Sequence, residues 1–284
     1  MHQWNPSDYE KNSSVQERAA LTILSKLDLK GDEHILDIGC GDGKITLKMA
    51  SMVPRGQVLG IDSSQEMIAF ARQRILSSSI PPSSTPSPSI PSSSTPSSPY
   101  ANLSFETRDA LNLNYNNEFD LVTSFACLHW IKDHLAVLKG IERSLKPGGK
   151  MIIQCRGRSE GMDDDIFALT REVIRSERRS RYFRGYSNSQ GVYGPDEYHA
   201  WLDQAGLEEL NTDLTIKDLV MPGRAELEGF IRTMWLSVTE HIPDEMRSQF
   251  IGEISERYLE RLPLKDGLAY VGMGVLEVAA RKPE

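Results

Sequence analysis

The sequence of 284 residues has no long apolar run and no excess of positive charge. No apolar stretch approaches the roughly 20 residues that a helix needs to cross a membrane. The formal net charge is −8 at pH 7, whereas a domain that binds nucleic acid usually presents a basic face. We therefore expect a partner that is neither a membrane nor a nucleic acid.

Cysteine and histidine are also sparse. The three cysteines, Cys40, Cys127 and Cys155, lie far apart without a C-x-x-C pair, which favours reduced thiols over a disulfide or zinc framework. The six histidines do not cluster, so we predict no metal site. Residues 1–6 lack the basic and apolar regions of a secretory signal. We therefore expect a cytoplasmic protein, either a monomer or a homodimer.

Segments typical of strands and of helices alternate along the first half of the chain. Short apolar runs that end in turn residues predict strands, and apolar residues at helical spacing predict helices. Strands are expected at 34–38, 57–62, 103–107, 119–124, 150–155, 212–220 and 268–281, and helices at 14–27, 43–52, 64–76 and 131–145. This alternation implies crossover connections and a mostly parallel, doubly wound α/β sheet.

A segment of different composition, 77–99, interrupts this pattern. Every residue in it is Ser, Thr or Pro except Ile80 and Ile90. Such a stretch cannot bury enough apolar surface to offset the entropy of ordering it, and its prolines block helices and strand ladders. We predict a disordered surface insertion with polyproline character, and a phosphorylated or partner-binding loop remains the alternative.

The strongest local signal is the sequence Asp-Ile-Gly-Cys-Gly-Asp-Gly at 37–43, which follows a strand and precedes a helix. Glycines let the backbone turn sharply and approach a ligand closely, as in many nucleotide-binding folds. The charge of Asp37 distinguishes between the ligands that such a turn could bind. The pyrophosphate of a dinucleotide needs amide donors at this place, and a carboxylate would repel it, whereas an ammonium group would be attracted.

Two further acids follow the next two strands. Asp62 ends the second strand, about twenty residues after the glycines, where an acid can accept hydrogen bonds from both hydroxyls of a ribose. Asp109 follows the third strand, in the sequence Thr-Arg-Asp-Ala, where it could accept a hydrogen bond from an adenine amino group.

Together these residues resemble the class I methyltransferases that use S-adenosylmethionine (SAM). The match runs from Ile35 to Cys155. It includes the glycine turn, Asp62 and the Leu-Lys-Pro-Gly-Gly sequence at 145–149. The resemblance implies SAM as the cofactor and a Rossmann-like, seven-stranded sheet with an antiparallel closing strand and a helical lid insertion. The cofactor-binding residues that it implies, at the turn and the strand ends, are Asp37, Gly39, Cys40, Gly41, Asp62, Ser63, Met67, Asp109, Ala110 and Phe125.

A narrower resemblance concerns the N-terminus and the segment after the fourth strand. Trp4-Asn5-Pro6 with Tyr9 and Gln16, and Ala-Cys-Leu-His-Trp at 126–130, are similar to trans-aconitate 2-methyltransferase-like enzymes. The second segment also resembles juvenile-hormone-acid methyltransferases. This resemblance implies O-methylation of a small carboxylic acid. It also implies that Trp4 and Tyr9 belong to a segment that folds over SAM.

The acceptor decides which residues catalysis needs. A carboxylate is already nucleophilic, so its methylation requires mainly alignment and desolvation. An alcohol or phenol would need a general base, for which His129 is the candidate. An acidic acceptor would favour an arginine, and Arg156 follows the fifth strand. The catalytic candidates are therefore His129, Trp130 and Arg156.

Other functions stay open at this stage. They are N-, C- or phenol O-methylation of another small metabolite, and SAM binding without catalysis. Asp37 disfavours a dehydrogenase.

We expect a single domain over 1–284. Within it we expect an N-terminal lid and helix at 1–30, a SAM-binding core at 31–156 interrupted by 77–99, a helical substrate lid at 157–204, and closing strands and helices at 205–284.

The insertion gives a first test. Replacing residues 77–99 by a short Gly/Ser turn should leave the melting temperature and the SAM affinity nearly unchanged. The reason is that each doubling of loop length changes the loop-closure free energy by only about 0.6 kcal/mol. Thermal unfolding and calorimetric titration against the full chain check this. Loss of the fold or of SAM binding would show that the segment is structural.

Overall fold

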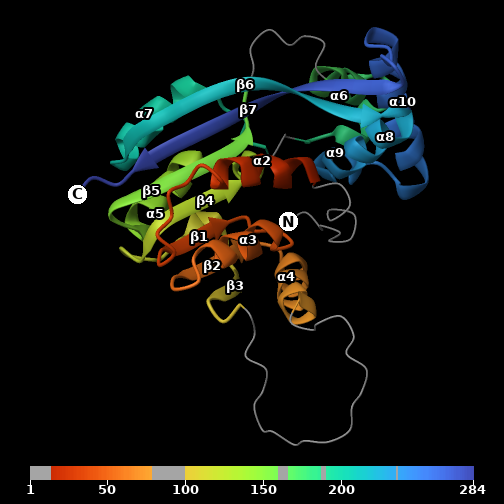
Figure 1. The fold of residues 1–284 in the computed structure, drawn as a ribbon. Coiled ribbons are helices and arrows are strands. Elements are labelled where there is room, and N and C mark those ends of the chain that lie inside the picture. Colours follow the sequence, from red (N-terminus) through yellow and green to blue (C-terminus); the bar gives the residue numbers. More distant parts are fainter. Residues whose placement is uncertain (1–13, 79–99, 159–165, 187–189, 235) are drawn as a thin grey trace, which may run out of the picture.

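The computed structural model describes residues 14–78, 100–158, 166–186, 190–234 and 236–284 (Figure 1). Trp4, Tyr9 and most of the Ser/Pro-rich insertion lie outside these residues. The helices are α2 (Ser14–Leu24), α3 (Lys44–Met52), α4 (Gln65–Ser78), α5 (His134–Ser144), α6 (Ile166–Arg175), α7 (Pro195–Ala205), α8 (Gly223–Met234), α9 (Leu236–Thr239) and α10 (Asp244–Arg261). Three short 3-10 helices accompany them, namely η1 (Ala110–Asn112), η2 (Leu128–Trp130) and η3 (Ser180–Phe183).

A seven-stranded sheet forms the centre of the molecule, in the order β3-β2-β1-β4-β5-β7-β6. Its strands are β1 (His34–Ile38), β2 (Gln57–Asp62), β3 (Leu103–Thr107), β4 (Phe119–Phe125), β5 (Leu145–Arg156), β6 (Glu208–Pro222) and β7 (Leu268–Arg281). Strands β1 to β5 pair in parallel, and β7 pairs antiparallel with both β5 and β6. The structure thus confirms the mostly parallel sheet with an antiparallel closing strand. The strand order runs outward in opposite directions from β1 and from β4, so it reverses between these two strands. Open α/β sheets bind ligands at such a point.

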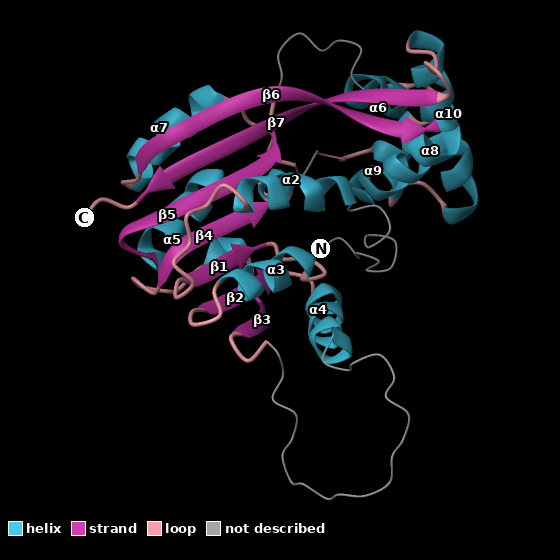
Figure 2. Cartoon of the chain, in the orientation of Figure 1, coloured by secondary structure: helices cyan, strands magenta, loops and turns pink. Residues whose placement is uncertain are grey.

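Alternate residues of each strand pack against helices on opposite faces (Figure 2). In β1, Ile35 belongs to a core with α2, α3 and α4, whereas Leu36 and Ile38 belong to a core with α5 and α7. Both faces are therefore covered, as a parallel sheet requires. The expected helix at 131–145 begins only at His134, because the side chain of Asp133 caps it by accepting a hydrogen bond from the Ala136 N–H at 2.9 Å.

The closing strands extend beyond the rest of the sheet. Residues 275–281 of β7 pair with β5, whereas β6 pairs along the whole of β7 from 268 to 281. The overhanging part of β7, which carries Ala269 and Val271, belongs to a second core with α6, α8 and α10. Figure 1 shows these helices gathered around the far end of the β6–β7 pair. Helix α7 instead packs on the central sheet through Tyr198 and Leu202. The helices between 157 and 204 therefore divide between two cores.

A buried carboxylate joins three elements of the central sheet. Asp37 of β1 accepts hydrogen bonds from the hydroxyl of Thr46 on α3 at 2.7 Å and from that of Thr123 on β4 at 3.0 Å. Its side chain is only 2% exposed. Burial raises the pKa of Asp37 to about 6, although the two hydroxyls oppose the shift. The charged carboxylate is thus held by hydrogen bonds but remains costly to bury.

This shift predicts how stability depends on pH. Between the ordinary pKa of Asp and about 6, the folded protein binds more protons at Asp37 than the unfolded chain does, so the free energy of unfolding falls as pH rises. The Asp37→Asn variant lacks this titration. The free energy of unfolding of the wild type minus that of the variant should therefore fall by on the order of 1–3 kcal/mol from pH 4 to pH 7.

Urea unfolding of the two proteins without cofactor, at both pH values, measures this difference. The other carboxyl groups cancel, because both proteins share them. A difference between the proteins that stays the same at pH 4 and pH 7 would contradict the prediction.

Candidate functional site

The turn after β1 can be formed only by glycine. Gly39, Gly41 and Gly43 have φ values of 73°, 53° and 78°, in the left-handed region that glycine adopts without strain. A Cβ atom on Gly39 would lie 2.2 Å from Sγ of Cys127, which follows β4. The turn is also tied to the end of β2, because the Gly39 N–H donates to the Ile61 carbonyl at 2.8 Å. The turn is consequently packed tightly between the ends of β2 and β4.

Asp62, at the end of β2, is held in place by backbone donors. Its Oδ2 accepts from the Gly41 N–H at 3.0 Å, and its Oδ1 accepts from the Ser64 N–H at 2.9 Å. Burial raises the pKa of Asp62, and these backbone donors oppose the shift. Each carboxylate oxygen has further lone pairs. Asp62 is therefore a fixed acceptor that could receive hydrogen bonds from two adjacent hydroxyls.

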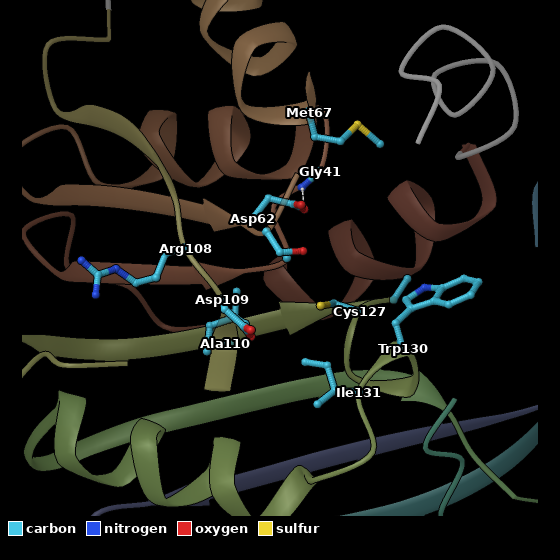
Figure 3. A pocket seen from close by; sticks show the side chains of 13 residues that line it. Gly41, Asp62, Met67, Arg108, Asp109, Ala110, Cys127, Trp130 and Ile131 are labelled. Carbon is cyan, nitrogen blue, oxygen red and sulfur yellow. Dashed lines mark hydrogen bonds between the residues drawn. The ribbon is translucent and has the colours of Figure 1, made fainter. Parts of the chain in front are cut away.

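These elements surround a cavity of about 390 Å³ at the carboxyl edge of the sheet (Figure 3). Its lining residues come from the segments that follow β1, β2, β3 and β4. They are Ile38, Gly39, Gly41, Asp62, Ser63, Met67, Arg108, Asp109, Ala110, Ala126, Cys127, Trp130 and Ile131. The cavity thus brings together seven residues predicted to bind the cofactor, Gly39, Gly41, Asp62, Ser63, Met67, Asp109 and Ala110, and one catalytic candidate, Trp130.

Three other predicted cofactor residues, Asp37, Cys40 and Phe125, are not among the described residues that line this cavity. Asp37 lies on the face of β1 that α3 covers, so its carboxylate meets threonine hydroxyls there. Cys40 and Phe125 are 8% and 5% exposed and belong to the core on the same face. Side chains alternate between the faces of a strand, so a residue at a strand end can support a ligand site without touching the ligand.

Five lining residues were not predicted, namely Ile38, Arg108, Ala126, Cys127 and Ile131. Each is next to, or within two residues of, a residue that was predicted. These residues could have been predicted from the sequence because they lie at or shortly after the carboxyl end of a predicted strand. Figure 3 shows the Arg108 side chain pointing away from the other labelled residues. Its guanidinium lies 4.8 Å from the centroid of the Tyr115 ring.

The segment after β4 is fixed by a helix from the C-terminal half of the chain. Nε2 of His134 lies 2.7 Å from the Leu128 carbonyl, and Nδ1 lies 2.8 Å from the hydroxyl of Tyr198 on α7. A carbonyl can only accept, so Nε2 carries the proton and the Tyr198 hydroxyl donates to Nδ1. These two hydrogen bonds hold η2 in position, and with it Trp130 at the wall of the cavity.

The other two catalytic candidates are not among the described residues that line the cavity. His129 is 4% exposed, and its ring centroid lies 5.1 Å from that of Trp130. Burial, together with a smaller effect of the positive charge of Arg156, lowers the pKa of His129 to about 3. Arg156 ends β5, where its guanidinium lies 3.0 Å from the centroid of the Phe167 ring and donates to the side chain of Gln190 at 3.3 Å. Only Trp130 of the three lines the cavity.

The cavity fits SAM in the features that the chain can supply. Gly39 and Gly41 line the cavity with backbone, so the chain there can approach the methionine part of the cofactor closely. The fixed carboxylate of Asp62 suits the ribose hydroxyls. Burial raises the pKa of the Cys127 thiol far above its usual range, so this group is neutral. In the described part of the chain, no group of three or more His, Cys, Asp or Glu residues could hold a metal ion, and no helix could span a membrane.

Comparison with known proteins agrees with this geometry. Residues 36–153 match the family model described as a methyltransferase domain. An uncharacterized methyltransferase of Schizosaccharomyces pombe is 31% identical over 215 residues, which cover 72% of this chain and 70% of the relative. A trans-aconitate 2-methyltransferase of Deinococcus radiodurans is 26% identical over 260 residues, which cover 90% of this chain and 87% of the relative.

Solved structures share the fold at low sequence identity. The YcgJ protein of Bacillus subtilis superposes with a TM-score of 0.61 at 14% identity, over 94% of this chain and 99% of that one. A phosphoethanolamine N-methyltransferase of Haemonchus contortus, solved in complex with SAM, gives a TM-score of 0.59 at 21% identity, over 98% of this chain and 57% of that one. The glycine turn, the held Asp62 and the sequence relatives lead to one conclusion: the chain belongs to the class I SAM-dependent methyltransferases.

Proposed function

We propose that this methyltransferase transfers the methyl group of SAM to a carboxylate oxygen of a small organic acid and so forms a methyl ester. The observation that carries this proposal is the pairing of Arg156 with His129, whose charge environment includes the Arg156 guanidinium. The guanidinium of Arg156 is a permanent cation, and the buried imidazole of His129 is neutral. A neutral imidazole beside a cation suits an anionic acceptor that needs no base.

The cofactor cavity supplies alignment. When bound, SAM offers a methyl group on a positively charged sulfonium. The backbone of Gly39 and Gly41 would hold its methionine part, and Asp62 its ribose. Asp109 already accepts a hydrogen bond from the Leu111 N–H at 2.9 Å through Oδ1, which fixes the carboxylate that would face the adenine amino group.

Arg156 is suited to orient a carboxylate. Its guanidinium rests on the Phe167 ring, and Gln190 accepts one of its hydrogen bonds. A guanidinium positioned in this way loses little side-chain entropy when it binds an acid, and a planar guanidinium matches a planar carboxylate. Strands β4 and β5 are parallel neighbours. Arg156, at the end of β5, and Trp130, shortly after β4, therefore belong to the same carboxyl edge of the sheet.

The same geometry disfavours an alcohol or phenol as the acceptor. A general base works best with a pKa near the operating pH. His129, the sequence candidate for that base, has a pKa lowered to about 3, so it would hold an abstracted proton poorly. Trans-aconitate 2-methyltransferases among the relatives, at 24–27% identity, support an acid as the acceptor class.

A panel experiment tests the proposal. The protein is incubated with methyl-labelled SAM and a set of small acids, phenols and amines, and each product is then treated with mild base. A carboxyl methyl ester releases the label as volatile methanol, whereas an aryl ether or an N-methyl group retains it. We expect base-labile label with one or more acids. Transfer that yields only base-stable label would refute carboxyl methylation.

Arg156 gives a second test. Charge-assisted hydrogen bonds contribute about 1.5–3 kcal/mol, so Arg156→Leu should raise the KM for the acid about 10- to 100-fold. Arg156→Lys should recover part of this loss, because it keeps the charge but not the planar fork. The affinity for S-adenosylhomocysteine should change little, because Arg156 is not among the described residues that line the cofactor cavity.

The neighbouring Arg158 is the matched control. Its side chain is 51% exposed and pairs with Glu197, so Arg158→Leu should leave the KM for the acid nearly unchanged. An equal effect of the two leucine variants would show that Arg156 has no specific role in acceptor binding.

A further inference from the structure

The imidazole of His129 is buried without any hydrogen bond to the described part of the chain. Neither Nδ1 nor Nε2 has a partner, and the residue is 4% exposed. Buried polar groups in proteins are almost always hydrogen-bonded, because an unsatisfied one loses its bonds to water without replacement. A buried, unsatisfied histidine therefore calls for a partner that the described residues do not supply.

His134, five residues later, shows what a structural histidine looks like in the same region. It is 1% exposed, and both of its ring nitrogens have hydrogen-bond partners, at 2.7 and 2.8 Å. The two histidines have similar burial and lie in the same segment after β4. Burial alone therefore does not explain why the nitrogens of His129 are unsatisfied.

The backbone around His129 is fixed on both sides. The Leu128 carbonyl accepts from His134 at 2.7 Å, and the carbonyl of His129 accepts from the Gly191 N–H at 3.1 Å. A Cβ atom on Gly191 would lie 2.1 Å from the Ile131 carbonyl oxygen, so the two segments are in close contact. The backbone that carries the imidazole is thus held from both sides.

The same contact brings His129 next to Arg156. Gly191 binds the backbone of His129, and its neighbour Gln190 accepts a hydrogen bond from the guanidinium of Arg156. The positive charge of Arg156 disfavours protonation of His129, and it attracts an anion to the same place. A neutral imidazole still carries one N–H donor.

From this arrangement we infer that His129 binds the acceptor. Its imidazole N–H donates a hydrogen bond to the carboxylate of the acid that Arg156 attracts, and it does not act as the general base. This assignment rests on the proposed carboxylate acceptor. It makes His129 a residue that determines specificity, because an acceptor without an oxygen in this position leaves the imidazole unsatisfied.

The inference makes opposite predictions for stability and for acceptor binding. In the free protein, His129→Leu removes an unsatisfied polar group, so the melting temperature should stay the same or rise by about 2–4 °C. The affinity for S-adenosylhomocysteine, measured by calorimetry, should not change. The KM for the best acid from the panel should rise about tenfold or more, and His129→Gln, which keeps an N–H donor, should recover part of that affinity.

The matched control is His134→Leu. This substitution leaves the Leu128 carbonyl and the Tyr198 hydroxyl without their partner, so the melting temperature should fall. A similar fall for His129→Leu would overturn the inference, because it would show that His129 is a structural residue. A variant His129→Leu with unchanged KM and a strongly lowered kcat would also overturn it, in favour of a general base.

The experiment separates this inference from the proposed function. If the wild type methylates acids and His129→Leu retains the wild-type KM and kcat, the inference fails while the proposed function stands. If the wild type methylates only phenols or amines, the proposed function fails. The inference then fails with it, because it assigns the imidazole N–H of His129 to the carboxylate of an acid.

Discussion

The close approach of two strand ends, at Gly39 after β1 and Cys127 after β4, is the constraint on which the site depends. A single added methyl group at Gly39 would lie 2.2 Å from the Cys127 sulfur. The adjacent parallel strands bring these turns to one edge of the sheet, and the hydrogen bond from Gly39 to Ile61 ties the first turn to β2 as well. The position of the backbone that faces the cofactor is thus set by packing.

Charge is distributed unevenly along this edge. Two acids, Asp62 at the end of β2 and Asp109 after β3, line the cofactor cavity, whereas Arg156, the last residue of β5, is not among the described residues that line it. This order suits a reaction between a cationic donor and an anionic acceptor, because each reactant meets groups of opposite sign. Two buried groups in the segment after β4, the Cys127 thiol and the His129 imidazole, are neutral.

The C-terminal half of the chain supports the site from behind. Tyr198 of α7 donates to His134, whose other nitrogen holds the Leu128 carbonyl and therefore η2. Phe167 of α6 supports the guanidinium of Arg156. The segment at 190–191 links Arg156 to His129. The described lining of the cofactor cavity thus comes from the first half of the chain, but contacts from the second half hold both Trp130 and the proposed acceptor residue Arg156.

The amino-acid sequence was sufficient to predict the sheet, the glycine turn with Gly39, and the acid Asp62 at the end of the second strand. These features are local, because strand periodicity and the need for positive φ are visible within a few residues. Only the tertiary structure decided that Asp37 faces two threonine hydroxyls and that the nitrogens of His129 stay unsatisfied. The groups that decide a buried side chain's hydrogen bonds come from distant segments, such as Thr123, which is 86 residues from Asp37, and no local pattern encodes them.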